Sequence, residues 1–210
     1  VGTGANGITI VSSLQEAFAV NKPDVVVDFT SPKVIFDNAK FVLENGVNII
    51  IGTTGLTAEQ RDILSDIADR HHANGLVAPN FSLGAVLLMK LSAEVAKYMP
   101  NVEIIELHHN KKSDAPSGTA KLTAEKIADA RVEEPEEDLT KESLPGARGG
   151  KYKGVTIHSV RLPGYVAHQE VLFGGYGELL TLRHDSLDRK SFMPGVMMAC
   201  RKVMTTDGFV

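Results

Sequence analysis

Hydrophobic and polar positions repeat one pattern between residues 25 and 80. Continuous apolar runs at 25–29, 47–51 and 75–78 are typical of strands that are buried on both faces. Two stretches between them carry apolar residues at helical spacing, namely Ile35, Ala39, Val42 and Leu43 in the first and Ile63, Leu64, Ile67 and Ala68 in the second. This β-α-β-α-β order predicts a parallel, right-handed, doubly wound sheet.

Polar residues and glycines indicate where the two helices begin and end. Ser31 is expected to cap the first helix, and Gly46 is expected to end it. Thr57 and Gln60 have the spacing of a capping box at the start of the second helix, which Gly75 should close.

After residue 81 the pattern predicts a different arrangement. The expected elements are a helix from Ser82, as cap, to Tyr98, a strand at 102–107, a helix at 119–131, a loop at 133–154, strands at 155–161, 168–175 and 178–184, and a helix from Ser191 to Met204. No helical stretch separates the last three strands, so we expect an antiparallel or mixed sheet. The chain then divides into a nucleotide-binding α/β layer (1–80) and an α+β layer (81–189), with residues 190–210 packing back on the first.

The opening VGTGANG spells the G-x-G-x-x-G pattern of dinucleotide sites with Gly2, Gly4 and Gly7. That fingerprint requires a strand before the glycines and a helix that opens at the last one. Here the β-branched stretch at 8–13 follows and predicts a strand instead. We therefore expect a loop at 1–7 and a cofactor site elsewhere.

Composition narrows the classes of function. The 210 residues are 43% hydrophobic and 23% charged, which is typical of globular proteins. The net charge of −4 gives no electrostatic reason to expect a nucleic acid or a membrane as partner, and no apolar run reaches the length of about 18 residues that a membrane span needs. A single cysteine, Cys200, fits a reducing compartment, so we expect a cytoplasmic protein, or one of the plastid stroma if the source is a plant.

Candidate chemistry gathers at strand ends. Phe29-Thr30, the stretch 52–55 and the stretch 79–82 follow the three parallel strands, where such sheets bind ligands, although turns alone also favour these residue types. The densest cluster is HHNKKSDAPSGTA at 108–120, where Ser117-Gly118-Thr119 precedes a helix whose first N–H groups can bind an anion. A solvated basic loop with ordinary N-capping is the alternative.

Other candidates have simpler explanations. His71 and His72 suit the negative end of a helix dipole, and Cys200 suits a helix core. We expect no metal site, because neighbouring residues on a strand, such as His108 and His109, point to opposite faces.

These motifs resemble the dihydrodipicolinate reductase family through essentially the whole chain. The resemblance is carried by VVVDFTSP, IGTTGLT, APNFSLG, EIIELHHNKKSDAPSGTA, HSVRLPG, HQEVLFGGYGE and RHDSLDRKSF. It implies a Rossmann-type domain, a mixed α+β domain for substrate binding and oligomerisation, and a homotetramer. It also implies hydride transfer from NADH or NADPH to a cyclic unsaturated dicarboxylate, 4-hydroxy-tetrahydrodipicolinate, in the diaminopimelate route to lysine.

Residue by residue, the resemblance implies that His108 is the catalytic acid/base and Lys112 a proton donor. It implies that the substrate carboxylates are bound by His109, Ser117, Gly118 and Thr119. The residues that would line the cofactor site are Phe29, Thr30, Gly52, Thr53, Thr54, Ala78, Pro79, Asn80 and Phe81.

One departure from the family is large. The family begins with a strand, a glycine turn and a helix, whereas residues 1–18 align with a later segment. We therefore expect a fragment with an incomplete Rossmann-type sheet, in which the choice between NADH and NADPH cannot be read. Another NAD(P)-dependent reductase of a small anionic substrate and a non-catalytic ligand-binding relative stay as alternatives, and His108 together with Lys112 favours an enzyme.

Overall fold

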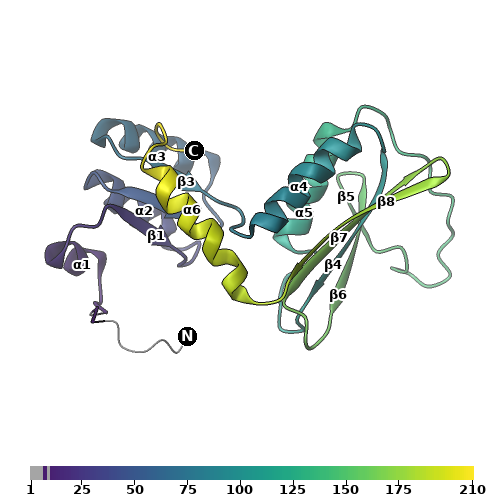
Figure 1. Ribbon diagram of the computed structural model, residues 1–210, viewed down its shortest axis with the longest axis horizontal. Coiled ribbons are helices and arrows are strands. Elements are labelled where there is room, and N and C mark those ends of the chain that lie inside the picture. Colours follow the sequence, from purple (N-terminus) through teal and green to yellow (C-terminus); the bar gives the residue numbers. More distant parts are fainter. Residues whose placement is uncertain (1–6, 9) are drawn as a thin grey trace. The chain divides into compact units, whose positions relative to one another are not determined.

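The computed structural model describes residues 7, 8 and 10–210 and forms two compact units (Figure 1). Unit 1 comprises the chain up to Pro79 together with Met197–Val210, and unit 2 comprises Asn80–Val196.

Unit 1 is a parallel α/β unit. Its elements up to Pro79 are α1 (Leu14–Val20), β1 (Val25–Asp28), α2 (Ile35–Glu44), β2 (Asn48–Ile51), α3 (Ala58–His71) and β3 (Gly75–Val77). The strands lie in the order β1-β2-β3 and all pairs are parallel, with Val25 opposite Asn48 and Ile49 opposite Gly75. The predicted β-α-β-α-β series is confirmed.

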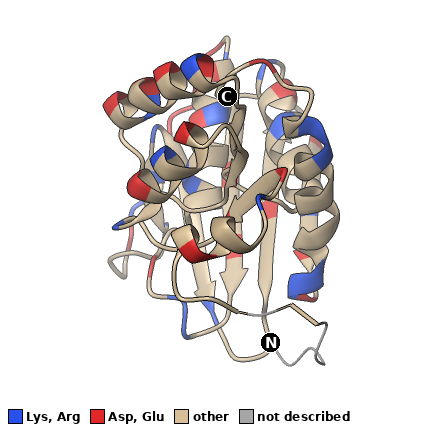
Figure 2. Cartoon of the chain, turned by 90° about the vertical axis from the view of Figure 1, so that its left-hand side faces the viewer, with Lys and Arg blue, Asp and Glu red and all other residues tan. Residues whose placement is uncertain are grey.

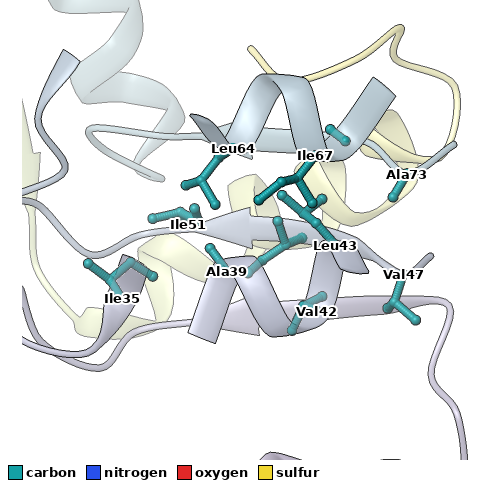
Figure 3. Close-up of a cluster of buried hydrophobic side chains, with 11 residues drawn as sticks. Ile35, Ala39, Val42, Leu43, Val47, Ile51, Leu64, Ile67 and Ala73 are labelled. Carbon is teal, nitrogen blue, oxygen red and sulfur yellow. The ribbon is translucent and has the colours of Figure 1, made fainter. Parts of the chain in front are cut away.

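A buried apolar cluster joins α2, α3 and β2 (Figure 3). The four apolar residues predicted for the first helix are all fully buried. Leu64, Ile67 and Ala68 of α3 belong to the same cluster, but Ile63 is 43% exposed, because it lies beside the buried stripe rather than on it. The helical spacing therefore identified the core of unit 1, apart from one position.

The helix ends agree only in part with the prediction. The capping box is confirmed, because Gln60 N donates to Thr57 Oγ1 at 3.1 Å and Thr57 N donates to Gln60 Oε1 at 3.0 Å. Ser31 is not the cap of α2: its carbonyl accepts from Val34 N, so residues 31–34 form a turn before the helix. Gly75 does not close α3, which ends with His72 in the left-handed conformation.

The strand predicted at 8–13 is wrong for the residues that the structure describes there. Ile10 is 97% exposed, and the strands of the sheet pair with one another and not with this stretch. A β-branched sequence forms a strand only where a neighbouring strand pairs with it. Gly2 and Gly4 lie outside the described residues, and among those described the first helix begins at Leu14, seven positions after Gly7.

Unit 2 is built on a mixed sheet. Its elements are α4 (Leu83–Ala96), β4 (Asn101–His108), α5 (Gly118–Ala130), β5 (Gly150–Tyr152), β6 (Val155–Arg161), β7 (Ala167–Gly175), β8 (Glu178–Ser186) and the 3₁₀ helix η1 (Arg189–Phe192). The strand order is β5-β6-β4-β7-β8, in which only β4 and β6 are parallel. The mixed sheet is confirmed, and β5 is a short strand within the predicted loop, held by pairing with β6.

Helices α4 and α5 pack against one face of this sheet (Figure 1). Alternation along β4 turns Val102 and Ile104 toward the helices, where they join Ala124 and Ile127 of α5 in a buried cluster. The same alternation places Glu106 on this face.

Helix α6 (Met193–Val203) begins in unit 2 and continues into unit 1. The last residues then run along the outer edge of β3. Gly75 N donates to Gly208 O at 3.0 Å, Val210 N donates to Gly75 O at 2.9 Å, and Val77 N donates to Val210 O at 2.8 Å. The C-terminal residues thus continue the sheet of unit 1 beyond β3.

Candidate active site

A cavity of about 280 Å³ lies within unit 2, where β4 ends and α5 begins. Its lining comes from α4 and α5, from the loop after β4, and from β7, β8 and η1. The lining residues are Asn80, Ser82, Ala85, His108, His109, Lys112, Ser117, Thr119, Val166, Ala167, His168, Gln169, His184, Ser186, Arg189 and Phe192. This described set includes Lys112 and Arg189 as cations and no Asp or Glu, so the cavity suits an anionic ligand.

His108 stands at the end of β4, two positions after Glu106 and on the same face. Its Nδ1 makes a short hydrogen bond with Glu106 Oε2. Glu106 is fully buried, and an ionised carboxylate can only accept, so Nδ1 carries the proton. The other ring nitrogen, Nε2, is therefore the one available to a ligand in the cavity.

Arg161, at the end of β6, pairs with Glu106. Its Nη2 donates to Oε1 at 2.6 Å and its Nη1 to Oε2 at 3.0 Å. Burial alone would raise the pKa of Glu106, but hydrogen bonds from His108, Arg161 and Ser159 lower it to about 2. The pair is a bidentate contact between a guanidinium and a carboxylate.

Lys112 reaches the cavity from the loop that follows β4. Its Nζ lies 2.6 Å from Asp114 Oδ1, and this hydrogen bond holds the pKa of Asp114 below its usual value. Asp114 is therefore ionised near neutral pH, and this ion pair holds the Lys112 side chain in place.

The N-terminus of α5 faces the same cavity. Ser117 caps the helix by accepting from Ala120 N at 3.1 Å, as expected for a helix start. The N–H groups of Gly118 and Thr119 have no acceptor within the helix, since they belong to its first turn. A Cβ added at Gly118 would meet nothing within 4 Å, so there is open space beside this backbone.

A second group of histidines lines the cavity from β7 and β8. His168 Nδ1 lies 2.6 Å from Asp185 Oδ1, and Arg183 holds the pKa of Asp185 below its usual value. His184 Nε2 lies 3.1 Å from Ser82 Oγ, and burial lowers the pKa of His184. Ser82 is the cap residue of α4, as predicted, but its hydroxyl contacts His184 rather than the helix N–H groups.

The predicted residues of unit 1 lie at the carboxyl ends of its parallel strands. Thr30 Oγ1 and Thr53 Oγ1 both donate to Asp28 Oδ1, at 2.7 and 2.9 Å. Burial would raise the pKa of Asp28, but hydrogen bonds from Thr30, Asn38 and Thr53 lower it. These two hydroxyls therefore hold the loops together. Thr54 is exposed, and Phe29 is 55% exposed.

The structure brings together His108, His109, Lys112, Ser117, Thr119 and Asn80 around one cavity, with Gly118 between two of them. His109 shares the cavity with His108 because β4 ends at His108, so strand alternation does not extend to His109. Among the predicted cofactor residues, Phe29, Thr30, Gly52, Thr53, Thr54, Ala78 and Pro79 fall in unit 1, whereas Asn80 and Phe81 fall in unit 2. Phe81 is only 7% exposed, unlike Phe29.

The sequence reasoning missed Glu106, Arg161, His168, Gln169, His184 and Arg189. The sequence could have indicated Glu106, because it stands on the buried face of an alternating strand, where a charged residue is costly unless it is paired. No local sequence pattern indicates His168 and His184, because only the pairing of β7 with β8 brings them beside the cavity.

Two further properties concern the described residues alone. They contain no group of three or more His, Cys, Asp or Glu placed to hold a metal ion. None of their helices is long and apolar enough to cross a membrane. In the view of Figure 2, basic and acidic residues are interspersed along the helices.

Comparison with known proteins gives a consistent result. Residues 1–81 match the family described as "Dihydrodipicolinate reductase, N-terminus", and residues 84–210 match "Dihydrodipicolinate reductase, C-terminus". The 4-hydroxy-tetrahydrodipicolinate reductase of Listeria welshimeri is 54% identical over 197 residues, which are 93% of this chain and 74% of that protein. The protein of the same name from Carboxydothermus hydrogenoformans is 47% identical over 210 residues, 100% of this chain and 80% of that protein.

Solved structures agree. The dipicolinate-bound dihydrodipicolinate reductase from Paenisporosarcina sp. TG-14 is similar with a TM-score of 0.89 and 45% identity, covering 100% of this chain and 80% of that one. An amine dehydrogenase from Mycobacterium smegmatis is similar with a TM-score of 0.61 at 12% identity, covering 96% of this chain and 78% of that one. The second similarity concerns the fold alone.

Proposed function

We propose that this chain, which belongs to the dihydrodipicolinate reductase family, reduces 4-hydroxy-tetrahydrodipicolinate to tetrahydrodipicolinate with NADH or NADPH, with loss of the hydroxyl group as water. One observation carries the proposal. A cavity free of acidic lining residues holds His108, whose Nδ1 is bound by a buried carboxylate, beside Lys112 and the N-terminus of α5. This arrangement offers a proton and positive charge to one anionic substrate.

The carboxylates of the substrate are assigned to the start of α5. The backbone N–H groups of Gly118 and Thr119 have no acceptor within α5, and the space beside Gly118 is open. The dipole of the helix favours an anion at this end. Lys112 and His109 contribute to the same cavity from the loop after β4. A dicarboxylate, like the dipicolinate bound by the relative from Paenisporosarcina, can use both sets.

The cofactor is assigned to the strand ends of unit 1. Phe29, the backbone at Gly52 and the hydroxyl of Thr54 fit a flat ring, because they are accessible at the edge where parallel strands end. When bound, the nicotinamide supplies a hydride. Asp28 fixes the loops of Thr30 and Thr53 around this edge through its hydrogen bonds. Ala78, Pro79, Asn80 and Phe81 follow the third strand.

His108 is assigned the proton transfer to the substrate. The carbon atom beside the one that accepts the hydride must gain a proton. The neutral ring, with its own proton on Nδ1, takes up a proton at Nε2, and the resulting imidazolium gives that proton to the substrate in the cavity. Lys112 stabilises negative charge that develops on the substrate, because Lys112 lines the cavity and its partner Asp114 does not.

We also propose that unit 1, with residues 197–210, is the nucleotide-binding domain and that unit 2 binds substrate and assembles a homotetramer. The face of the mixed sheet opposite α4 and α5 supports the second part. Alternation places Ile105, Leu172 and Leu179 on it, and Leu179 is 86% exposed. Light scattering should report four copies per particle, and Leu179→Arg should lower that number.

The single Cys200 supports a cytoplasmic location.

The decisive experiment follows oxidation of NADH and NADPH by the purified protein with 4-hydroxy-tetrahydrodipicolinate. We expect substrate-dependent loss of the nicotinamide absorbance, and strong reduction of that rate in His108→Gln. Tight binding of dipicolinate without any turnover would instead support a non-catalytic relative. Turnover of other anionic substrates alone would support another reductase.

A further inference from the structure

We propose that Glu106 is the residue that positions His108 for proton transfer, and that Arg161 anchors Glu106 in turn; this rests on the proposed role of His108. Glu106 touches neither the cavity nor a ligand, since it is fully buried and absent from the lining. It is a positioning residue that acts through the imidazole.

The surroundings of Glu106 are saturated with donors. Oε2 accepts from His108 Nδ1 and from Arg161 Nη1 at 3.0 Å. Oε1 accepts from Arg161 Nη2 at 2.6 Å and from Ser117 N at 3.3 Å. Ser159 also donates to this carboxylate. An ionised carboxylate can accept from all of these donors, whereas a neutral side chain leaves at least one of them without an acceptor.

These contacts join the separate parts of the site. Arg161 Nη2 also donates to Asp114 O at 2.8 Å, and Asp114 holds Lys112. Ser117 is the cap of α5, whose first turn is assigned to the substrate. One buried carboxylate therefore links the proton donor to the loop of Lys112 and to the anion-binding helix.

The geometry determines which nitrogen of His108 carries the proton. As long as Glu106 is ionised, Nδ1–H donates to it and the lone pair of the neutral ring sits on Nε2, inside the cavity. A carboxamide at position 106 can turn its NH₂ group toward Nδ1, which reverses the tautomer and leaves Nε2 protonated in the neutral ring. The same ring would then be unable to take up a proton at the cavity side.

The test compares Glu106→Gln with Glu103→Gln. Glu103 lies on the same strand, contacts His158 Nε2 at 2.7 Å and pairs with Arg148, yet it points to the opposite face and lies outside the cavity. We expect Glu106→Gln to lower kcat about 10- to 100-fold while the Kd for dipicolinate changes less than about threefold. Glu103→Gln should retain kcat.

Two readouts separate positioning from loss of structure. NMR of protein labelled at the histidine nitrogens should show Nδ1–H for His108 in the native protein and a gain of Nε2–H in Glu106→Gln, with His108→Gln used for assignment. If Glu106→Gln does not fold, Glu106→Gln combined with Arg161→Gln removes both charges and should fold, bind dipicolinate and retain the low kcat.

The outcomes distinguish this inference from the proposed function. An active native enzyme in which Glu106→Gln retains kcat, or in which the tautomer of His108 does not change, overturns the positioning role alone. A native protein that binds dipicolinate but does not reduce the substrate overturns the proposed function, and the tautomer measurement still reports on Glu106.

Discussion

Asn80 Nδ2 donates to Thr119 Oγ1 at 3.2 Å, across 39 positions of the chain. Asn80 was predicted on the cofactor side and Thr119 on the substrate side. Asn80 Oδ1 also accepts from Ser82 N at 2.8 Å, so the amide is held by both ends. The contact ties the entrance of α4 to the first turn of α5 and fixes the Thr119 hydroxyl.

Thr119→Val should raise KM for the substrate about threefold to tenfold, because it removes one hydroxyl contact to an anion. KM for the cofactor should stay unchanged. Thr119→Ser retains the hydroxyl and serves as the control. Steady-state kinetics, with substrate and cofactor varied in turn, gives both KM values. If only the KM for the cofactor rose, the assignment of Thr119 to the substrate would be wrong.

Gly118→Ala should weaken substrate binding without harming the fold. The added methyl group meets no protein atom within 4 Å and occupies the space assigned to a carboxylate. Alanine is also the better helix former, by about 1 kcal/mol in a helix interior. We expect an unchanged or higher melting temperature and a dipicolinate Kd raised at least about tenfold by a steric clash. Unaltered dipicolinate affinity would place the ligand elsewhere.

His108→Gln should lower kcat about 100-fold, within the usual range for a general acid–base group, with little change in cofactor affinity. His71→Gln, at the exposed end of α3, is the matched control and should do almost nothing. If His108→Gln retained a near-native kcat, with chemistry shown to limit the rate, the proton donor would be Lys112 or water and not His108.

Lys112→Ala should lower kcat and raise substrate KM together, because it removes a charge that both binds the substrate and stabilises the charge that develops on it. Its neighbour Lys111 is exposed, so Lys111→Ala is a control for net charge. Equal effects of the two substitutions would reduce the role of Lys112 to general electrostatics.

Acid should destabilise unit 2 through Glu106. Its pKa is about 2 in the folded protein against 4.5 as the ordinary value, so its stabilisation is complete above 4.5 and is lost as pH falls toward 2. The contribution amounts to about 3 kcal/mol. Urea unfolding at a series of pH values should show a smaller acid-dependent loss in Glu106→Gln than in the native protein. Identical slopes would mean that the carboxyl is not ionised there.

Local patterns predicted most of the framework, and particular residues show why. Thr57 and Gln60 form their capping box from contacts within one turn, and Ile35, Ala39, Val42 and Leu43 share a face by helical geometry alone. The stretch 8–13 failed because strand formation depends on a partner that its own sequence does not specify. Ser31 failed because a turn before α2 satisfies the same backbone groups.

The residues of the candidate site also divide into those that local sequence predicts and those that depend on long-range pairing. The loop after β4 and the start of α5 are contiguous in sequence, so His108, Lys112 and Thr119 were found together. Arg161 lies 55 positions from Glu106, and their contact depends on the parallel pairing of β4 with β6. Such pairing is set by the whole sheet and not by either segment.

The strand-like end of the chain also has a consequence for solubility. With Gly208–Val210 hydrogen-bonded along β3, the backbone groups on that side of the sheet are occupied by the molecule's own residues. Without these residues the outer edge of β3 would be open, and an open strand edge is a template on which other molecules add strands. Trimming the chain before Asp207 should therefore promote self-association, whereas surface changes elsewhere on unit 1 should not.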